Sequence, residues 1–397
     1  GLKGKLRPLM CGATLRRLSA SALCSFDKEL MAASAGEAQF AVGTPAGIEK
    51  IGATLQTLLE AFPELAVLQF DADSAFNNMN RETVLTKLEA TAPHLLTFAA
   101  LWLTRPFVAV LTKTDGSYAL LPTTSGVDQG DPLAPFLFAL GLPLDEIRAR
   151  LQRLLQVSAG QNEGQQVSMF AALLSYLDDL SLAVPAHLAD AARKIVTEGF
   201  ARVGLEINAN KSGVYAPSGQ CPPGCEDWWS NAVRHDGLLV CGKPFDATLL
   251  DFDYNPAGDT AVFPLGSARF VSDFTEAYVN KVERFIGAVC RIPALADPGE
   301  PAVQAANLLL RYCSYLKATH LLGLLPPDAT CSMSRRIDDA VLQGFAKLNQ
   351  LSPGDVSEAS AMLQLPTSRG GLGLRPLAPL CDAAFFASWL QCAHSVG

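Results

Sequence analysis

The chain contains short, mostly apolar runs bounded by polar residues, and each such run is typical of a buried β-strand. Leu65 to Phe70 is the first of these runs, and it ends at Asp71-Ala72-Asp73. Two others, residues 171–177 and 180–184, are separated only by Asp178-Asp179. Two short runs around a two-residue break predict a β-hairpin with the two aspartates as its turn.

Helices are predicted where capping residues precede stretches of mixed apolar and charged residues. Asn80, with Glu82 in the first turn, predicts one helix start. Asp131-Pro132 predicts another, because proline suits the first helical position, and this helix is expected to continue from Leu133 to Leu155. From about Phe270 onward the chain reads as mostly helical. Basic residues stand among the apolar positions there: Lys281, Arg284, Arg291, Arg311 and Lys317.

The aspartate pair carries the clearest chemical signal. Tight hairpin turns favour glycine-containing pairs, whereas adjacent carboxylates about 4 Å apart repel each other by about 4 kcal/mol at an effective dielectric of about 20. A bound divalent cation would offset this repulsion; a solvated acidic turn is the simpler alternative. Asp71 ends another buried strand, so three carboxylates can meet in an oxygen-rich site suited to Mg²⁺. Two such ions about 3.5–4 Å apart can catalyse phosphoryl transfer.

Composition is that of a globular protein of two or three subdomains, with 397 residues, 49% hydrophobic and 18% charged. The apolar stretches Leu95 to Leu103 and Leu133 to Leu144 are too short or too interrupted by proline to cross a bilayer. No signal segment opens the chain, and Gly1 in place of Met suggests a fragment or a processed product. We expect an intracellular protein, in the nucleus or the cytoplasm, without a membrane partner.

The formal charge of −8 argues mildly against a nucleic-acid partner, because phosphate binding needs Lys and Arg. The first 17 residues nevertheless hold basic residues and no acid: Lys3, Lys5, Arg7, Arg16 and Arg17. Carboxylates that bind metal also lower the total charge without repelling a metal-bound substrate. The acidity therefore does not exclude a polymerase.

Ten cysteines are scattered, mostly in apolar surroundings, which indicates reduced thiols in the core. Cys221-Pro-Pro-Gly-Cys225, with His235 and Cys241 downstream, is the one cluster that could bind zinc. Its spacing matches no standard zinc pattern, so a surface loop is the favoured interpretation.

Several motifs follow one another along the chain: Lys5-Leu-Arg7-Pro8, Phe70-Asp71 through Ala75-Phe76-Asn77, Gly126-Val-Asp-Gln129-Gly130-Asp131-Pro132-Leu133, Tyr176-Leu-Asp178-Asp179, and Gly204-Leu205-Glu-Ile-Asn208 with Lys211. Two more come later: Leu239-Val-Cys-Gly242-Lys-Pro244, and Leu365-Pro366 through Gly370-Gly371-Leu-Gly373-Leu. This series resembles the reverse transcriptases of non-LTR (LINE-like) retrotransposons; the two later motifs are similar to their primer-grip hairpin and to a stretch after their thumb. Each motif is weak alone, and the specificity comes from their order over nearly the whole chain.

The resemblance implies an α+β, right-hand polymerase fold. Residues 1–65 would belong to the fingers, and residues 66–245 to a palm with an antiparallel sheet and an inserted fingers segment near 95–125. Residues 246–350 would form a helical thumb whose basic face follows the primer–template backbone, although any amphipathic bundle has the same pattern. Residues 351–397 would follow the thumb. The upstream nucleic-acid-binding segments and downstream endonuclease of full-length relatives are not expected here.

The resemblance also assigns three aspartates to metal binding. Asp71 matches the first metal-binding carboxylate of the palm, and Asp178 and Asp179 match the aspartate pair. They would hold two Mg²⁺ ions, with Mn²⁺ as an alternative, which activate the primer 3′-hydroxyl and neutralise the triphosphate. Asp73 is expected to point to the opposite face of the strand and to be structural. Lys211 would protonate the leaving pyrophosphate, or else be a surface lysine.

Phe76, five residues after Asp71, matches the steric-gate position of the family. A flat ring beneath the sugar leaves no room for a 2′-hydroxyl, so the match implies selection of deoxynucleotides. The alternative is that Phe76 is a core aromatic residue.

The remaining substrate contacts are implied by two segments. Lys5 and Arg7 match basic residues of the fingers that grip the incoming triphosphate, and a solvated basic segment is the alternative. Gln129 and Gly130 match a loop that packs against the nucleotide and the template base, where glycine permits close approach. Asp128 departs from the family, which often has a basic or amide residue there, and it adds a negative charge beside the nucleotide pocket.

We therefore predict an RNA-directed DNA polymerase of a retroelement. It would add deoxynucleoside triphosphates to a DNA or RNA primer on an RNA template, by two-metal nucleotidyl transfer. One alternative is an inactive or domesticated remnant that at most binds RNA. Another is an RNA-directed RNA polymerase, which Phe76 disfavours, as does Tyr176-Leu-Asp178-Asp179 in place of the usual Gly-Asp-Asp.

Overall fold

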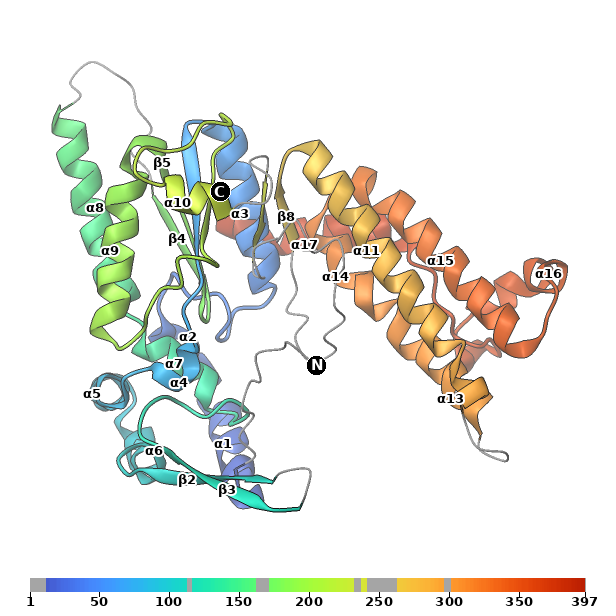
Figure 1. The fold of residues 1–397 in the computed structure, drawn as a ribbon, viewed down its shortest axis with the longest axis horizontal. Coiled ribbons are helices and arrows are strands. Elements are labelled where there is room, and N and C mark those ends of the chain that lie inside the picture. The colour runs from blue at the N-terminus through green and yellow to red at the C-terminus, as the bar shows by residue number, and fades with distance from the viewer. Residues whose placement is uncertain are drawn as a thin grey trace. The chain divides into compact units, whose positions relative to one another are not determined.

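The computed structural model describes residues 12–112, 116–161, 171–231, 237–240, 263–295 and 301–396. The chain divides into two compact units (Figure 1). The first comprises Gly1–Ile51 and Leu58–His235, and the second comprises Gly52–Thr57 and Asp236–Gly397. These units are coarser than the four predicted regions, whose limits stay predictions.

The first unit is built on a four-stranded antiparallel sheet with the order β4-β5-β1-β6. Its strands are β1 (Leu65–Phe70), β4 (Ala172–Tyr176), β5 (Asp179–Pro185) and β6 (Gly213–Tyr215). β1 lies between β5 and β6, and all of its residues are buried. The predicted buried strand is thus confirmed with both of its limits, and elements on both faces of the sheet must cover it.

Helices flank this sheet, and all of them except the third contribute residues to its apolar core. They are α1 (Thr14–Phe26), α2 (Lys28–Ala35), α3 (Gly47–Ala61), α4 (Ala75–Asn78), α5 (Arg81–Thr91), α6 (Pro93–Leu103), α7 (Ala134–Gly141), α8 (Leu144–Gln161), α9 (Ala189–Arg202) and α10 (Glu226–Asn231). α8 and α9 pack against each other beside the sheet (Figure 1). A separate hairpin is formed by β2 (Phe107–Thr112) and β3 (Tyr118–Thr123).

Two predicted helix starts have different outcomes. Asn80 caps α5 as expected, because its Oδ1 accepts a hydrogen bond of 3.0 Å from the Thr83 N–H. The single helix expected from Leu133 to Leu155 is instead two helices, α7 and α8. Pro143 separates them, and the residue before it, Leu142, has an extended backbone with ψ of 139°. Proline disfavours the helical conformation in the preceding residue, which ends α7.

The second unit is mainly helical, as predicted from about residue 270 onward. It contains β7 (Gly237–Val240) and β8 (Phe263–Gly266), which pair as a hairpin. Its helices are α11 (Ala268–Val289), α12 (Ile292–Leu295), α13 (Ala302–Leu309), the π-helical η3 (Leu310–Ser314), α14 (Leu316–Leu324), α15 (Pro327–Asn349), α16 (Pro353–Gln364) and α17 (Cys381–Val396). α11 packs against α15, and α14 packs against α17. Among the helices described in either unit, none has the length and apolar character needed to cross a membrane.

Candidate functional site

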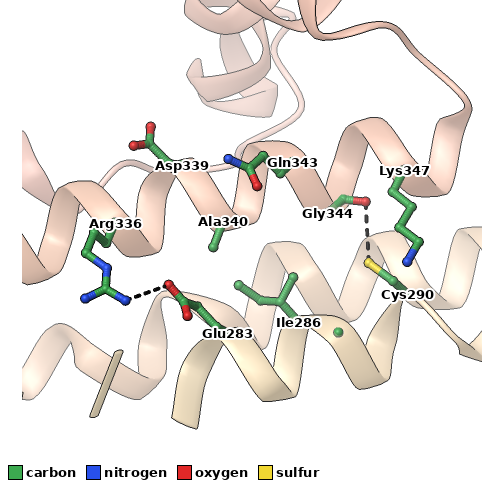
Figure 2. A pocket seen from close by; sticks show the side chains of 10 residues that line it. Glu283, Ile286, Cys290, Arg336, Asp339, Ala340, Gln343, Gly344 and Lys347 are labelled. Atoms are coloured by element: carbon green, nitrogen blue, oxygen red, sulfur yellow. Dashed lines mark hydrogen bonds and ion pairs between the residues drawn. The ribbon is translucent and has the colours of Figure 1, made fainter. Parts of the chain in front are cut away.

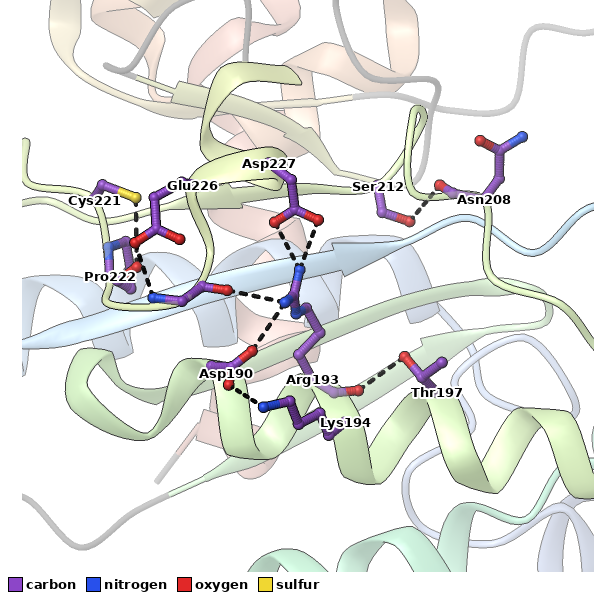
Figure 3. A network of polar contacts seen from close by, with 11 residues as sticks. Asp190, Arg193, Lys194, Thr197, Asn208, Ser212, Cys221, Pro222, Glu226 and Asp227 are labelled. Atoms are coloured by element: carbon purple, nitrogen blue, oxygen red, sulfur yellow. Dashed lines mark hydrogen bonds and ion pairs between the residues drawn. The ribbon is translucent and has the colours of Figure 1, made fainter.

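Asp71 directly follows β1, and the chain segment before β6 holds its backbone. The Asp71 N–H donates to Ser212 Oγ at 3.1 Å, and the Asp71 carbonyl accepts from the Asn208 N–H at 2.8 Å. Ser212 Oγ in turn donates to the Asn208 carbonyl at 2.9 Å (Figure 3). The position of this predicted catalytic carboxylate is therefore set by the sheet on one side and by a closed hydrogen-bonded loop on the other.

The aspartate hairpin is present, but its turn begins one residue earlier than predicted. Tyr176 pairs with Asp179, so the two turn residues are Leu177 and Asp178, and Asp179 is the first residue of β5. This register pairs Leu180 with Phe70 of β1 and leaves Leu180 fully buried. A shift of one residue would turn every side chain of the strand to its other face, so core packing selects the observed register.

The same register brings the predicted metal ligands to one end of the sheet. Because Phe70 pairs with Leu180, extending the antiparallel pairing by one residue places Asp71 opposite Asp179. Asp178 lies next to them in the turn. The structure thus places the three aspartates at neighbouring backbone positions, although they come from segments that are more than one hundred residues apart.

Lys211 lies between Asp71 and Asp73. Its Nζ is 3.2 Å from Asp71 Oδ1 and 3.3 Å from Asp73 Oδ1. Partial burial lowers the pKa of Lys211, but attraction to Asp71 and the hydrogen bonds that Lys211 donates to both aspartates outweigh this effect and raise the pKa. Lys211 is thus paired with the carboxylates at this end of the sheet, and its role as the proton donor to pyrophosphate stays a prediction.

The expectation that Asp73 points away from Asp71 was wrong. Residues two apart along an extended chain project to the same side, so both carboxylates reach Lys211. Asp73 Oδ2 also accepts a hydrogen bond of 2.9 Å from Asn208 Nδ2. Asp73 thus helps to hold the lysine and the loop that supports Asp71.

The donor chemistry at this end of the sheet fits a hard divalent cation, because Asp71, Asp178 and Asp179 all offer carboxylate oxygens. In the part of the chain that the structure describes, however, no three His, Cys, Asp or Glu side chains are arranged to hold a metal ion. Asp71 is paired with the Lys211 ammonium instead. Metal binding by these three aspartates stays a prediction.

Two of the four candidate zinc ligands, Cys221 and Cys225, lie in the described part of the chain. Cys225 is fully buried, and burial raises its pKa to about 11. Burial also raises the pKa of Cys221. His235 and Cys241 lie outside the described residues.

Phe76 lies in α4 and packs as a core residue. Its ring stacks on Phe138 of α7 with a centroid distance of 4.3 Å and an interplanar angle of 9°, and the residue is only 8% exposed. Its carbonyl accepts a hydrogen bond of 2.8 Å from Val127 N–H. Phe76 therefore touches the loop that carries Gln129 and Gly130, and its steric-gate role stays a prediction.

The loop from Gly126 to Asp131 is held tightly against α4 and α5. Gly126 has φ of 75°, and a Cβ there would lie 2.4 Å from the carbonyl oxygens of Phe76 and Asn77, so only glycine fits. Arg81 Nε donates to the Gly126 carbonyl at 2.8 Å. These contacts fix the base of the loop that presents Gln129 and Gly130.

Arg16 neutralises the unexpected negative charge of Asp128. Its guanidinium is 2.9 Å from Asp128 Oδ2 and 2.8 Å from Asp131 Oδ2, and the three side chains are only 12%, 9% and 8% exposed. It also lies 4.7 Å from the centroid of the Trp102 ring. Sequence reasoning placed Arg16 only in a basic segment, because nothing local links α1 to a loop more than one hundred residues later.

A second network of polar contacts, centred on Arg193, supports β1. Arg193 of α9 donates to both oxygens of Asp227 at 2.7 and 2.9 Å, to Asp190 Oδ1 at 2.9 Å and to the Gly224 carbonyl at 2.9 Å (Figure 3). The same guanidinium lies 5.3 Å from the centroid of the Trp228 ring. The network thereby fixes α10 and the loop before it onto α9.

Trp228 connects this network to the candidate site. Its ring meets Phe70 edge-to-face at a centroid distance of 5.0 Å, and Phe70 is the last residue of β1 before Asp71. Such aromatic pairs stabilise by about 0.5–1.5 kcal/mol beyond the area they bury. The carboxylate end of β1 is thus held by packing as well as by hydrogen bonds.

Lys5 and Arg7 lie outside the described residues, as does most of the segment that resembles a primer grip, of which only β7 is described. Their predicted contacts with nucleotide and primer stay predictions.

The second unit has a cavity of about 540 Å³ between α11 and α15 (Figure 2). It is lined by Glu283, Ile286, Gly287, Cys290, Arg336, Asp339, Ala340, Gln343, Gly344 and Lys347. Arg336 is already paired with Glu276 at 2.5 Å and with Glu283 at 3.2 Å. The cavity contains none of the predicted site residues, so the aspartate end of the sheet remains the candidate site.

The family model "Reverse transcriptase (RNA-dependent DNA polymerase)" matches residues 3–235, which is more than half of the chain. The chain therefore belongs to the reverse transcriptase family. Its antiparallel sheet with surrounding helices agrees with the α+β polymerase fold that was predicted. No curated protein matches the chain.

Solved telomerase structures are similar to the chain at low identity. Candida albicans telomerase with a TWJ fragment of telomeric RNA is 13% identical, with a TM-score of 0.36 and coverage of 93% of this chain. Apo telomerase from Candida tropicalis is 11% identical, with a TM-score of 0.35 and coverage of 94%. The chain spans 57% and 59% of the length of these two proteins.

Replacing Arg16 with Met would leave Asp128 and Asp131 buried without their counter-charge. We expect the free energy of unfolding to fall by about 3–5 kcal/mol, the usual cost of removing one partner from a buried ion pair. Urea unfolding followed by circular dichroism measures this change. Arg17→Met removes the same charge from an exposed position of α1 and should cost less than about 0.5 kcal/mol. Equal unfolding free energies for the two variants would contradict this account of Arg16.

The Arg193 network predicts a pH dependence of stability. Hydrogen bonds from Lys194 and Arg193 lower the pKa of Asp190 below its ordinary 3.8, although burial opposes them. A carboxylate with a lowered folded-state pKa stabilises the fold above its unfolded pKa, and this contribution is lost as pH falls through the folded value. Asp190→Asn should therefore lower the free energy of unfolding by about 1 kcal/mol near neutral pH.

This difference between wild type and Asp190→Asn should shrink as pH falls below 3.8. Urea unfolding at a series of pH values measures it, with Glu358→Gln on an exposed face of α16 as the control. A difference that stayed constant from neutral to acid pH would show that charge on Asp190 is not involved.

Proposed function

We propose that this chain is the RNA-directed DNA polymerase core of a retroelement and extends a DNA or RNA primer on an RNA template. The observation that carries the proposal is the convergence of Asp71 with the Asp178-Asp179 hairpin at one end of an antiparallel sheet, in a chain of the reverse transcriptase family. Reverse transcriptases generally use divalent metal ions. The non-LTR subtype rests on the order of the sequence motifs.

In this proposal Asp71, Asp178 and Asp179 hold Mg²⁺, with Mn²⁺ as an alternative. Bound ions would lower the pKa of the primer 3′-hydroxyl and neutralise charge on the triphosphate. Lys211, which lies beside Asp71, would release its contact there and protonate the departing pyrophosphate. The proximity of Lys211 Nζ to the Asp71 carboxylate supports its place in the site.

The nucleotide would lie between the aspartates and the loop from Gly126 to Asp131. Gln129 and Gly130 would contact the incoming base and the template, and Phe76 beneath the sugar would exclude a 2′-hydroxyl. Lys5 and Arg7 would bind the triphosphate. The hydrogen bond between Val127 N–H and the Phe76 carbonyl supports this arrangement, because it holds the loop next to the proposed gate.

We also propose that the protein acts inside the cell, in the nucleus or the cytoplasm. The cysteines in the described part of the chain are all free thiols. Free thiols are usual where glutathione and thioredoxin keep cysteines reduced.

The first test is primer extension on an RNA template with Mg²⁺ and deoxynucleoside triphosphates. Wild type should extend the primer, and the variant with Asp178→Asn and Asp179→Asn should lose extension by at least about 10³-fold, because the ligands for the ions are gone. Removal of one repulsive charge pair should leave the fold intact or slightly stabilised. Glu358→Gln, which removes a carboxylate from an exposed position of α16 in the second unit, is the control.

Extension by the double variant at the wild-type rate would refute the metal assignment. No extension by folded wild type, with either deoxynucleotides or ribonucleotides, would instead favour the inactive remnant that at most binds RNA. Extension with ribonucleotides alone would identify an RNA polymerase.

Replacing Phe76 with Ala tests the proposed gate. The ratio of kcat/KM for ribonucleotides to that for deoxynucleotides should rise by about 10–200-fold, the range that a small steric difference supplies. The ratio is independent of how much enzyme is folded, which matters because Phe76 stacks on Phe138. Phe138→Leu removes the stacking partner and should lower stability without changing the ratio. An unchanged ratio in Phe76→Ala would rule out the steric gate and leave Phe76 with only its packing role in the core.

A further inference from the structure

Gln39, in the segment between α2 and α3, is a buried polar residue to which the sequence motifs assign no role. It is only 3% exposed. Its backbone lies beside β4, the edge strand of the sheet that leads into the aspartate hairpin. Phe40 N–H donates to the Ser175 carbonyl at 2.8 Å, and Ser175 N–H donates to the Ala38 carbonyl at 2.8 Å.

The side chain of Gln39 continues these contacts into the hairpin turn. Its Oε1 accepts hydrogen bonds of 3.0 Å from the N–H groups of Leu177 and Ala41. Its Nε2 donates to Ser175 Oγ at 3.1 Å, and Ser175 Oγ donates to the Leu177 carbonyl at 2.8 Å. Gln39 and Ser175 together therefore bind both backbone polar groups of Leu177.

Leu177 is the residue of the hairpin that most needs this support. It has φ of 57°, a left-handed value that costs a non-glycine residue about 1–3 kcal/mol. It is also the first residue of the turn and immediately precedes Asp178. A strained backbone of this kind persists only where its surroundings hold it in place, and the hydrogen bonds from Gln39 and Ser175 are such surroundings.

We propose that Gln39 is a positioning residue that holds the Leu177-Asp178 turn, and through it the carboxylates of Asp178 and Asp179, in the geometry needed for nucleotidyl transfer. This inference rests on the proposed polymerase function. Gln39 touches no reacting atom. Its loss would let Leu177 relax toward an ordinary φ and displace Asp178, and a displacement of about 1 Å can cost about 10²-fold in rate.

Gln39→Met is the main test, because it keeps the length of the side chain and removes its hydrogen bonds. We expect kcat for single-nucleotide addition to fall by about 10²-fold, while KM for the nucleotide changes less than about threefold. Hydrogen exchange at the Leu177 amide should become at least about tenfold faster, while amides of β1 keep their protection. Gln152→Met, which makes the same change at an exposed position of α8, should leave both readouts nearly unchanged.

A second substitution distinguishes positioning from simple loss of stability. Glycine adopts a positive φ without strain, so adding Leu177→Gly to Gln39→Met should restore part of kcat. If Gln39 served only to fill the core, removal of the Leu177 side chain would lower activity and stability further. Ser175→Ala removes the hydroxyl that Gln39 binds and should show the same changes as Gln39→Met to a smaller degree; it carries the test if Gln39→Met does not fold.

The outcomes separate this inference from the polymerase proposal. Unchanged exchange at Leu177 in Gln39→Met and Ser175→Ala, or a lowered kcat that Leu177→Gly does not restore, would overturn the positioning role. Wild type without extension would refute the polymerase proposal and the catalytic role of Gln39 with it. Exchange at Leu177 would still report whether Gln39 holds the turn, since that measurement needs no activity.

Discussion

The antiparallel pairing of β1 with β5 is the contact on which the rest of the candidate site depends. It joins Phe70 to Leu180, and so places the residue after β1 beside the aspartate hairpin. Burial holds this register, because both paired residues are almost completely excluded from water and a slip of one residue would expose them. Hydrophobic burial is not directional, yet by fixing this register it brings together the carboxylates that a polymerase needs.

Carboxylates that lie close together at one end of a sheet repel one another, and nearby basic side chains offset this repulsion. Lys211 pairs with Asp71 and Asp73, and Arg16 pairs with Asp128 and Asp131 in the neighbouring loop. The two pairs differ in character. The contacts of Arg16 are buried and join α1 to the loop. The contacts of Lys211 are partly exposed and lie at the predicted metal site beside Asp71. Breaking an exposed ion pair costs less free energy than breaking a buried one, because the separated charges regain water. Lys211 can therefore exchange its carboxylate partner for another group more easily than Arg16 can.

Hydrogen bonds to backbone groups supply the precision that apolar packing lacks. Ser212 and Asn208 hold the backbone of Asp71, Arg81 holds Gly126, and Gln39 with Ser175 holds Leu177. Most of these contacts join segments that are distant in sequence, and all of them act on segments that carry predicted site residues. The left-handed Leu177 shows why such support is needed, since its own side chain favours a different conformation.

Local patterns in the sequence were sufficient for the buried strand ending before Asp71, the Asn80 cap and the helical C-terminal part, because runs of apolar residues and capping side chains act over a few residues. The order of the motifs also indicated the reverse transcriptase family. Only the tertiary structure decided the register of the aspartate turn, the pairing of Asp71 and Asp73 with Lys211, and the roles of Arg16 and Gln39. These depend on contacts between segments far apart in the chain, and no local propensity records which buried polar groups will meet.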